Sequence, residues 1–583
     1  MFQEKQFNFR RASLVTVFML FFAATVLPAA TLNDTQVIKS DHWIYDAIYT
    51  LYTKSGKTCP GNSFPTTVGQ LKFLLRQIDT SELDISGTRV YEETYNFLYE
   101  RTTLGKRLGI EADEEEPSLR VGAEIRLNPE AYYKSNSNVN WYTFRTDPYF
   151  VDNFATIPVL VGFEDLITME ADFYYGKNLD VARKKDNYFN LATGSTDSDY
   201  LLPRFAYGST GLFKDKWGLS FHIATDGHSI GKTQTGSIIY NRTFETMAYT
   251  ELNLYSNKVS YALDVSQLDY NRFSYLHHIE IRPFDKFKFS IVEGGMAVSH
   301  LELRYLNPFM IIHSFRPADE YKQSEVPGTN DADHRYCAYL GISLEFVPCK
   351  NVRTYVLWAQ DEMQVPSELT TNYGKMLADA FGIQGGTEIF LPSNTSRTWK
   401  LNFESIYTLP YLYIKYSAQS SLYRARKKIT YVSGGSIKSW IGTPLGPDCL
   451  AFQTGITCAD TGKWSAGLSY LLTIHGEISF DIFTDQRWAF EVDGKTYYAY
   501  YPSVKYAKGL ATAEESIAEA RNKWLTGTLE HRHDIVLNGT YTLNKNFSFD
   551  GQFVYTFVFN NGHNPGNFQQ GVELAISATF KYF

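Results

Sequence analysis

The chain has 583 residues, enough for several soluble domains or for one large β-barrel. Its formal net charge of −8 argues against a nucleic-acid partner, because binding phosphates requires a basic surface. Aromatic residues make up 16% of the chain, with 42 Tyr and 41 Phe, whereas charged residues make up 20%. This balance favours pleated strands and is typical of the aromatic girdles of transmembrane barrels.

The first 30 residues have the pattern of a secretory signal peptide. Lys5, Arg10 and Arg11 precede an apolar run from Leu14 to Leu27, and residues 28–30 (Pro-Ala-Ala) supply a small-residue cleavage site. An uncleaved anchor is the alternative, but the apolar run is short for a spanning helix. No Cys follows the run to carry a lipid anchor. We therefore predict export, cleavage of residues 1–30 and an outer-membrane location.

The next segment, residues 31–117, predicts a small helical periplasmic domain that ends in an acidic linker. Three stretches repeat apolar residues at helical spacing: one from Trp43 to Tyr52, one that begins at Pro65, and one around Val90 to Leu98. Residues 111–117 then form an acidic run closed by Pro117. A calcium site is conceivable in this run, but a solvated linker is the simpler interpretation.

From residue 118 to residue 583 the apolar period changes to two, which indicates strands. Met169, Phe173 and Tyr175 alternate with polar residues, and so do the aromatic residues between Phe547 and Phe559. One apolar face and one polar face suit a strand that lies between lipid and a wet lumen. At about 25 residues per strand and its loop, we predict an all-β transmembrane barrel of about 16–18 antiparallel strands. A soluble β-sandwich or propeller is the alternative.

Turn residues predict two unlike barrel ends. Tight turns are predicted at residues 256–257, 283–285, 408–410 and 544–545, whereas long polar gaps run over 181–203, 318–334, 364–396, 424–462 and 500–523. The last gap contains a helical pattern between Ala511 and Lys523. Short turns at one end and long loops at the other are typical of outer-membrane barrels.

The last alternating run, from Val572 to Tyr582, predicts a strand that pairs with the first strand and so leaves no edge unpaired in lipid. The terminal Phe583 resembles the signal read by the barrel-assembly machinery of bacteria. The expected partners are therefore outer-membrane lipid and, during biogenesis, that machinery.

The sequence does not predict an enzyme, a cofactor or a metal. The segment around Ser209 lacks the GxSxG spacing of hydrolases, and HExxH does not occur. Asp331, Asp333 and His334 are consistent with an ordinary turn. Cys449 and Cys458 flank what reads as a short loop, which a disulfide could close, and two free thiols are the alternative.

Seven residues on the polar parity of their strands are predicted to face the lumen. They either line a binding surface for a ligand such as a sugar, or pair with each other inside a plugged barrel, and the sequence leaves both interpretations open. The seven are Glu170, Asp172, Asp264, Glu280, Arg282, Lys400 and Glu404.

One set of motifs resembles the Wzi-type capsule-assembly family of outer-membrane barrels. It comprises a Gly-rich strand, a Tyr-Leu-Asn-Pro element and, one hairpin later, an acidic pair followed by Gln, with Met363 where the family has an aromatic residue. The family-motif positions are Gly294, Gly295, Arg304, Tyr305, Asn307, Pro308, Asp361, Glu362 and Gln364.

The helical segment that begins at His42 also resembles the small domain that precedes the barrel in that family. The resemblance implies an 18-stranded barrel closed by its helical domain, with a non-enzymatic role in attaching exported polysaccharide to the cell surface. It assigns no glycan-contacting residue. A porin-like channel for small solutes and a loop-mediated adhesin are the alternatives.

Overall fold

The computed structural model describes residues 32–100, 106–110, 119–144, 153–177, 187–194, 197–199, 205–241, 248–309, 336–370, 375, 378–415, 420–427, 436–480, 489–492, 495–498 and 513–582. The predicted signal peptide (1–30), the acidic run (111–117), the group at 331–334 and Phe583 lie outside these ranges. No helix in the described part of the chain is long and apolar enough to cross a membrane.

Three short helices follow one another near the N-terminus, as the sequence predicts. They are α2 (Trp43–Lys54), α3 (Val68–Leu75) and α4 (Ile85–Tyr95). Each begins at a residue whose side chain accepts a hydrogen bond from a backbone N–H of the first turn: His42, Thr67 and Asp84. Such caps satisfy donors that would otherwise lack a partner, and they set where each helix begins.

The helices pack on one another through apolar faces and form a core to which the wall residues Tyr255 and Phe213 also contribute. Ile44, Ile48 and Leu51 of α2 are fully buried there, together with Val68 and Leu71 of α3. Two short strand pairs complete this part of the chain: β1 (Val37–Ile38) with β3 (Thr66–Thr67), and β2 (Ser63–Phe64) with β14 (Ser229–Ile230). We call residues 32–100 the helical domain.

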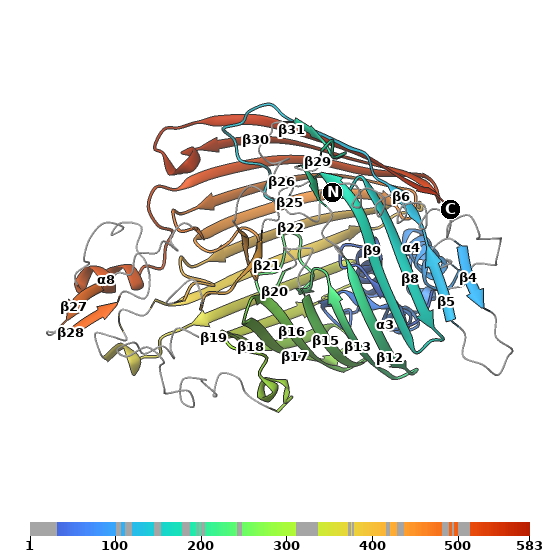
Figure 1. Ribbon diagram of the computed structural model, residues 1–583, viewed down its shortest axis with the longest axis horizontal. Coiled ribbons are helices and arrows are strands. Elements are labelled where there is room, and N and C mark those ends of the chain that lie inside the picture. Colours follow the sequence, from blue (N-terminus) through green and yellow to red (C-terminus); the bar gives the residue numbers. More distant parts are fainter. Residues whose placement is uncertain are drawn as a thin grey trace, which may run out of the picture.

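The remainder is a closed antiparallel barrel of 18 strands (Figure 1). Its first strand is interrupted and consists of β5 (Leu119–Ala123), β6 (Ile125–Leu127) and β7 (Glu130–Lys134). The last strand, β31 (Gln569–Tyr582), pairs with β6 and β7 and closes the wall. The strands between them are β8 (Ala155–Phe163), β9 (Ile167–Lys177), β12 (Ala206–Phe213), β13 (Trp217–Thr225), β15 (Ala248–Ser256), β16 (Val259–Asp269), β17 (Arg272–Phe284), β18 (Phe287–Ala297), β19 (Tyr336–Phe346), β20 (Val352–Glu362), β21 (Ala380–Leu391), β22 (Thr398–Thr408), β25 (Cys449–Asp460), β26 (Trp464–His475), β29 (Glu530–Asn544) and β30 (Phe547–Phe559).

Alternation along the wall separates an apolar outside from the interior. On β9, the side chains of Met169, Phe173 and Tyr175 are exposed on the outer face, whereas Glu170 and Asp172 are buried on the inner face. An outer face of this kind matches the hydrocarbon core of a bilayer, and closure leaves no strand edge without hydrogen bonds. The fold is thus that of an outer-membrane β-barrel.

The two ends of the barrel differ as predicted. At the end that we call the turn end, β15 and β16, β17 and β18, and β29 and β30 are joined by tight turns. At the loop end, the connections are long, with one exception, the short turn between Asp269 and Arg272. The helix α8 (Ala513–Ala520) lies in one of these long connections, as expected, and projects from the loop end together with β27 (Ala489–Val492) and β28 (Lys495–Tyr498) (Figure 1).

Three of the predicted connections are wrong. The gap 364–396 contains β21, and the gap 424–462 contains β25 together with the hairpin of β23 (Tyr423–Lys427) and β24 (Ser436–Trp440). In β21, Gly385 and Gly386 interrupt the alternation, and the Tyr355 ring occupies the space that a side chain at Gly386 would fill. Residues 408–410 do not form a tight turn, because the chain after Thr408 enters the barrel.

Candidate functional site

The helical domain closes the turn end of the barrel (Figure 1). The backbone N–H of Thr58 donates to the carbonyl of Asp285, in the β17–β18 turn, at 2.7 Å. The Lys350 ammonium, in the β19–β20 turn, donates to the carbonyl of Glu82 at 3.2 Å. Since these contacts join the domain to separate turns of the wall, they hold it across the barrel mouth.

A segment from the loop end descends to meet the helical domain. It follows β13, and we call residues 226–241 the inner strap. Its residues Ser229–Ile230 form a two-stranded sheet with Ser63–Phe64 of the helical domain, and Lys232 forms an ion pair with Asp46 of α2. The strap and the domain are therefore joined inside the barrel.

A buried charge network attaches the helical domain to the wall. The guanidinium of Arg353, on β20, donates to Glu388 and to Glu345, at 2.8 Å each, and is 2% exposed. The same group lies over the ring of Tyr49 in α2, 4.8 Å from its centre. The ammonium of Lys288 donates to the carbonyl of Cys59 at 2.7 Å. Burial of these charges is tolerated because each one has partners at close range.

The interior of the loop end is apolar. Its core combines inward-facing wall residues with the strap and with residues 409–415, and Ile238, Leu412 and Ile414 are fully buried in it. The hydroxyls of Tyr413 and Tyr339 donate to strap carbonyls, each at 2.5 Å. A packed core of this kind fills the lumen at this end of the wall.

The seven residues predicted to face the lumen do face it, and each one has an ion-pair or hydrogen-bond partner inside the barrel. Lys39 of the helical domain lies 2.7 Å from Asp172, and the Tyr207 hydroxyl donates to Glu170 at 2.9 Å. The other contacts are of the same kind and join Arg282 to Thr58, Lys400 to Glu388, Glu404 to Thr235, Glu280 to Gly61, and Asp264 to Ser266. Of the two interpretations that the sequence left open, the structure supports the plugged interior.

The family-motif residues lie near the loop ends of β18 and β20, which flank β19. Gly294 is paired with Tyr339 across the strands, and Asp361 lies one position beyond the pair of Leu340 and Gln360. A side chain on Gly294 would collide with the carbonyl of Tyr275, and one on Gly295 would approach that of Cys337 to 2.6 Å. These glycines therefore permit close packing of neighbouring strands.

The Tyr-Leu-Asn-Pro element covers the wall from outside the strands. Tyr305 is fully buried, and its ring lies 5.0 Å from that of Tyr275. Arg304 pairs with Glu302 at 3.2 Å, whereas Asn307 and Pro308 are exposed beyond it. The element thus fixes the course of the chain directly after β18.

The acidic pair secures the chain where it enters the barrel. Asp361 accepts a hydrogen bond from the backbone N–H of Tyr413 at 3.2 Å, and Glu362 pairs with Lys415. The side-chain amide of Gln364 donates to Glu362 at 2.8 Å. All of these contacts shape the loop end, and none of them places a reactive group in an open pocket.

Of the two alternatives for Cys449 and Cys458, the structure supports free thiols and not a disulfide. Both residues belong to one continuous strand, β25, where Cys449 pairs with His475 and Cys458 with Ala466. Nine residues of extended chain separate them by about 30 Å, far beyond the reach of a disulfide. All five cysteines are free thiols.

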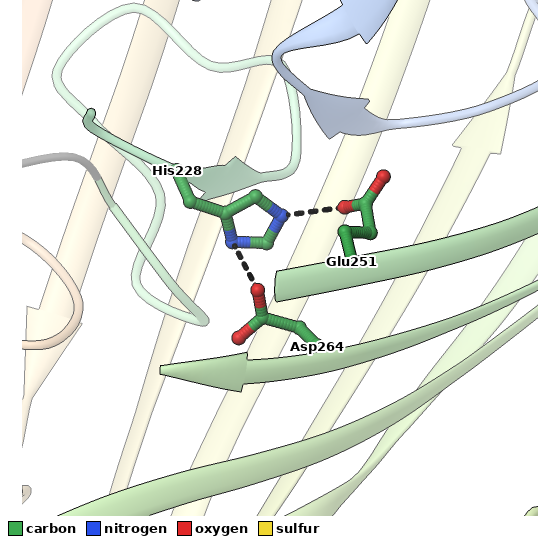
Figure 2. A group of neighbouring side chains, drawn as sticks. All are labelled: His228, Glu251 and Asp264. Atoms are coloured by element: carbon green, nitrogen blue, oxygen red, sulfur yellow. Dashed lines mark hydrogen bonds and ion pairs between the residues drawn. The ribbon is translucent and has the colours of Figure 1, made fainter. Parts of the chain in front are cut away.

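The sequence analysis did not anticipate a buried cluster of His228, Glu251 and Asp264, shown in Figure 2. His228 belongs to the inner strap, and its Nε2 lies 2.9 Å from Glu251 on β15, while its Nδ1 lies 3.6 Å from Asp264 on β16. Burial disfavours protonation of His228, but the two carboxylates outweigh it and raise the pKa of the imidazole.

The order of contacts around His228 resembles that of a nucleophile, a base and an orienting acid. The Ser63 hydroxyl lies 2.9 Å from Nε2, but it also donates to Glu251 at 2.7 Å, so that the carboxylate competes for its proton. Ser63 is 8% exposed and His228 is not exposed at all. The arrangement joins three chain segments rather than presenting a nucleophile to a substrate.

Fold and interior together define an outer-membrane β-barrel with an occupied lumen. No protein-family model and no curated protein matches the chain. Solved structures do resemble it. The structure of Wzi, described as a carbohydrate-binding outer-membrane barrel involved in group 1 capsule assembly in Escherichia coli, has a TM-score of 0.53. It shares 10% identity, over 93% of this chain and 98% of that chain, so that the likeness shows the fold.

Other outer-membrane proteins resemble the chain less. OprD of Pseudomonas aeruginosa has a TM-score of 0.36 at 10% identity, over 79% of this chain and 95% of that one. The channel DcaP of Acinetobacter baumannii has a TM-score of 0.32 at 11% identity, over 80% of this chain and 97% of that one.

Proposed function

We propose that this protein is a non-enzymatic outer-membrane scaffold, similar to Wzi, that attaches or assembles exported polysaccharide at the cell surface. The observation that carries the proposal is the filled interior: the helical domain enters from the turn end, and the strap with residues 409–415 enters from the loop end. A barrel filled from both ends suits a scaffold better than a pore. This weighs against the porin-like alternative.

The loop end is the surface that we assign to the polysaccharide. Short turns face the periplasm and long loops face outward in barrels of this class, and the family-motif residues gather at the loop end. Two aromatic rings are among its most exposed side chains: Phe309 at 93% and Tyr270 at 81%. Exposed rings offer apolar faces on which sugar rings can stack.

The route to this location is part of the proposal. The chain would be exported through its N-terminal signal peptide, which would be cleaved, and inserted into outer-membrane lipid by the barrel-assembly machinery. The apolar outer face and the closed wall support insertion into lipid.

The test is deletion of the gene, followed by assay of cell-associated and released polysaccharide. Deletion should shift polysaccharide from cells to medium, and unchanged cell-associated polysaccharide would contradict the proposal. Complementing the deletion strain with the double variant Phe309→Ala plus Tyr270→Ala should leave attachment of polysaccharide to the cells impaired. The matched control is Phe284→Ala, an exposed ring at the turn end, which should restore attachment. Loss of cell adhesion with normal polysaccharide would favour the adhesin alternative.

A further inference from the structure

The cluster around His228 lies where three parts of the molecule meet. Ser63 comes from β2 of the helical domain, His228 from the inner strap, and Glu251 and Asp264 from neighbouring wall strands, directly paired with each other. One ligand atom each of His228, Glu251 and Asp264 lies within 4.8 Å of the other two. All four side chains are buried.

Three atoms of this cluster have the spacing of a metal-binding face. The Ser63 Oγ lies 2.9 Å from His228 Nε2 and 2.7 Å from Glu251 Oε2, and those two atoms are 2.9 Å apart. For a tetrahedral ion with bonds of about 2.0–2.2 Å to N and O, adjacent ligands lie about 3.4 Å apart, so each side of the triangle would open by roughly half an ångström. A first-row divalent ion therefore fits against this triangle with small movements of the side chains.

Two neighbouring groups lack the hydrogen bonds that burial ordinarily demands. The Oδ2 atom of Asp264 has no hydrogen-bond partner and points at the His228 ring (Figure 2). His222, paired directly with Glu251 across the strands, is 1% exposed, and neither of its ring nitrogens is hydrogen bonded. Buried polar atoms without partners point to a bound group that supplies them, such as an ion and its water.

We propose that this cluster binds one divalent transition-metal ion of the Zn²⁺ class. His228 Nε2 and Glu251 Oε2 are the ligands, with the Ser63 hydroxyl or a water completing the set, and His222 lies next to Glu251 as a further donor. The Asp264 carboxylate lies 3.6 Å from Nδ1 of His228 and would orient the ring once the ion is bound, a common role for a carboxylate outside the first coordination shell. Imidazole with carboxylate oxygen suits Zn²⁺ better than Mg²⁺ or Ca²⁺.

The local charge is compatible with such an ion. Two carboxylates face the site, and a buried cation, Arg424, also acts on His228, with its guanidinium 4.5 Å from the centre of the Tyr240 ring. An imidazole that ligates a metal must be neutral, so with the ion bound the two carboxylates and Arg424 would contribute one net negative charge. The ion would tie the helical domain, the strap and the wall together, and this role is independent of any polysaccharide.

The probe is Zn²⁺ added to the full-length, detergent-solubilised barrel after treatment with a chelator. A chromophoric chelator that competes for the ion should report about one tight site per chain. His228→Ala should weaken Zn²⁺ binding by at least about 100-fold, because even removing a residue that only hydrogen bonds to a metal ligand lowers metal affinity by about 10–100-fold. The matched control, His300→Ala, removes an exposed imidazole outside the cluster and should leave affinity unchanged.

A second variant separates a metal from a purely structural histidine. His228→Cys replaces imidazole by a thiol that can ligate Zn²⁺ as thiolate, so it should retain binding and show a thiolate charge-transfer band with Co²⁺. Absence of a tight site in the wild type, or equal affinity in wild type and His228→Ala, would overturn the proposal. The cluster would then be a protonated histidine bridging two carboxylates.

Discussion

The two halves of the barrel interior are filled by different chemistry. At the turn end, the helical domain meets a polar wall through ion pairs and hydrogen bonds, among them the deeply buried pairs of Arg353. At the loop end, the connections between strands themselves fold inward and form an apolar core around Leu412 and Ile414. The inner strap joins the two halves.

This difference shows that one wall can support two kinds of plug. The inward parity of the strands carries Glu345 and Arg353 near the turns, but Tyr339 and Leu357 further along the same strands β19 and β20. A polar wall specifies its partner through paired charges, whereas an apolar wall gains stability from buried area. The following changes test each half in turn.

The largest effect is expected in the polar half, from Arg353→Met. Loss of the guanidinium leaves Glu345 and Glu388 buried without their shared cation, which should lower the free energy of unfolding by about 3–5 kcal/mol. Denaturant unfolding of the detergent-solubilised protein measures this change. Lys258→Ala breaks an exposed ion pair with Asp285 and should cost less than about 1 kcal/mol. Equal losses of unfolding free energy in Arg353→Met and Lys258→Ala would contradict the role given to the buried charges of the polar half.

In the apolar half, Leu412→Ala should destabilise by about 2–5 kcal/mol, because a fully buried side chain leaves a cavity that its neighbours cannot fill. Leu468→Ala is the control, since Leu468 is 46% exposed on the outer face, where lipid or detergent fills the space. The same unfolding assay applies. If Leu412→Ala proved as mild as Leu468→Ala, the loop end would not be a packed core.

A smaller effect is expected within the helical domain, from Asp84→Ala. Asp84 caps α4 through the backbone N–H of Gly87 and pairs with Lys54, and its loss should cost about 1 kcal/mol. Burial opposes ionisation of Asp84, but the Gly87 N–H and Lys54 outweigh it and lower the pKa of the carboxyl. The stabilisation by the Asp84 carboxylate should therefore be fully present above about pH 4, the pKa of Asp in an unfolded chain. It should be lost as the pH falls through the lowered pKa of Asp84 in the folded protein.

Comparing wild type with Asp84→Ala by denaturant unfolding at successive pH values measures this dependence. The difference in free energy of unfolding between wild type and Asp84→Ala should shrink toward acid pH. Asp84→Asn keeps a capping side chain and isolates the lost ion pair with Lys54. A difference that grows toward acid pH would contradict the assignment.

Local sequence patterns correctly predicted those helices and strands whose apolar periodicity is not disturbed by packing against neighbouring elements. The helices follow from their apolar spacing and from caps such as Thr67 and Asp84, and most strands follow from parity. Strand β21 was not predicted because Gly386 interrupts its alternation. This glycine makes room for the Tyr355 ring of the adjacent strand. In β25, the apolar Cys449 and Ala451 occupy the inner parity and the polar Thr454 the outer parity, which weakens the alternation.

The interior was harder to predict because long-range packing determines it. Asp264 was expected to face inward from its parity, but its pairing with Glu251 depends on strand register. His228 joins them only because the strap descends into the barrel, and nothing in the local sequence of residues 226–241 specifies that path. The family-motif residues were recognised by resemblance, and the structure assigns them packing and anchoring contacts.

The most direct test of the filled interior is the electrical conductance of the purified full-length protein in a planar lipid bilayer. Since the helical domain, the strap and the loop-end core occupy the barrel together, we expect insertion without stepwise ion currents. Steady open-channel steps in the wild-type protein would contradict the occluded scaffold and restore the channel as the better account of the barrel.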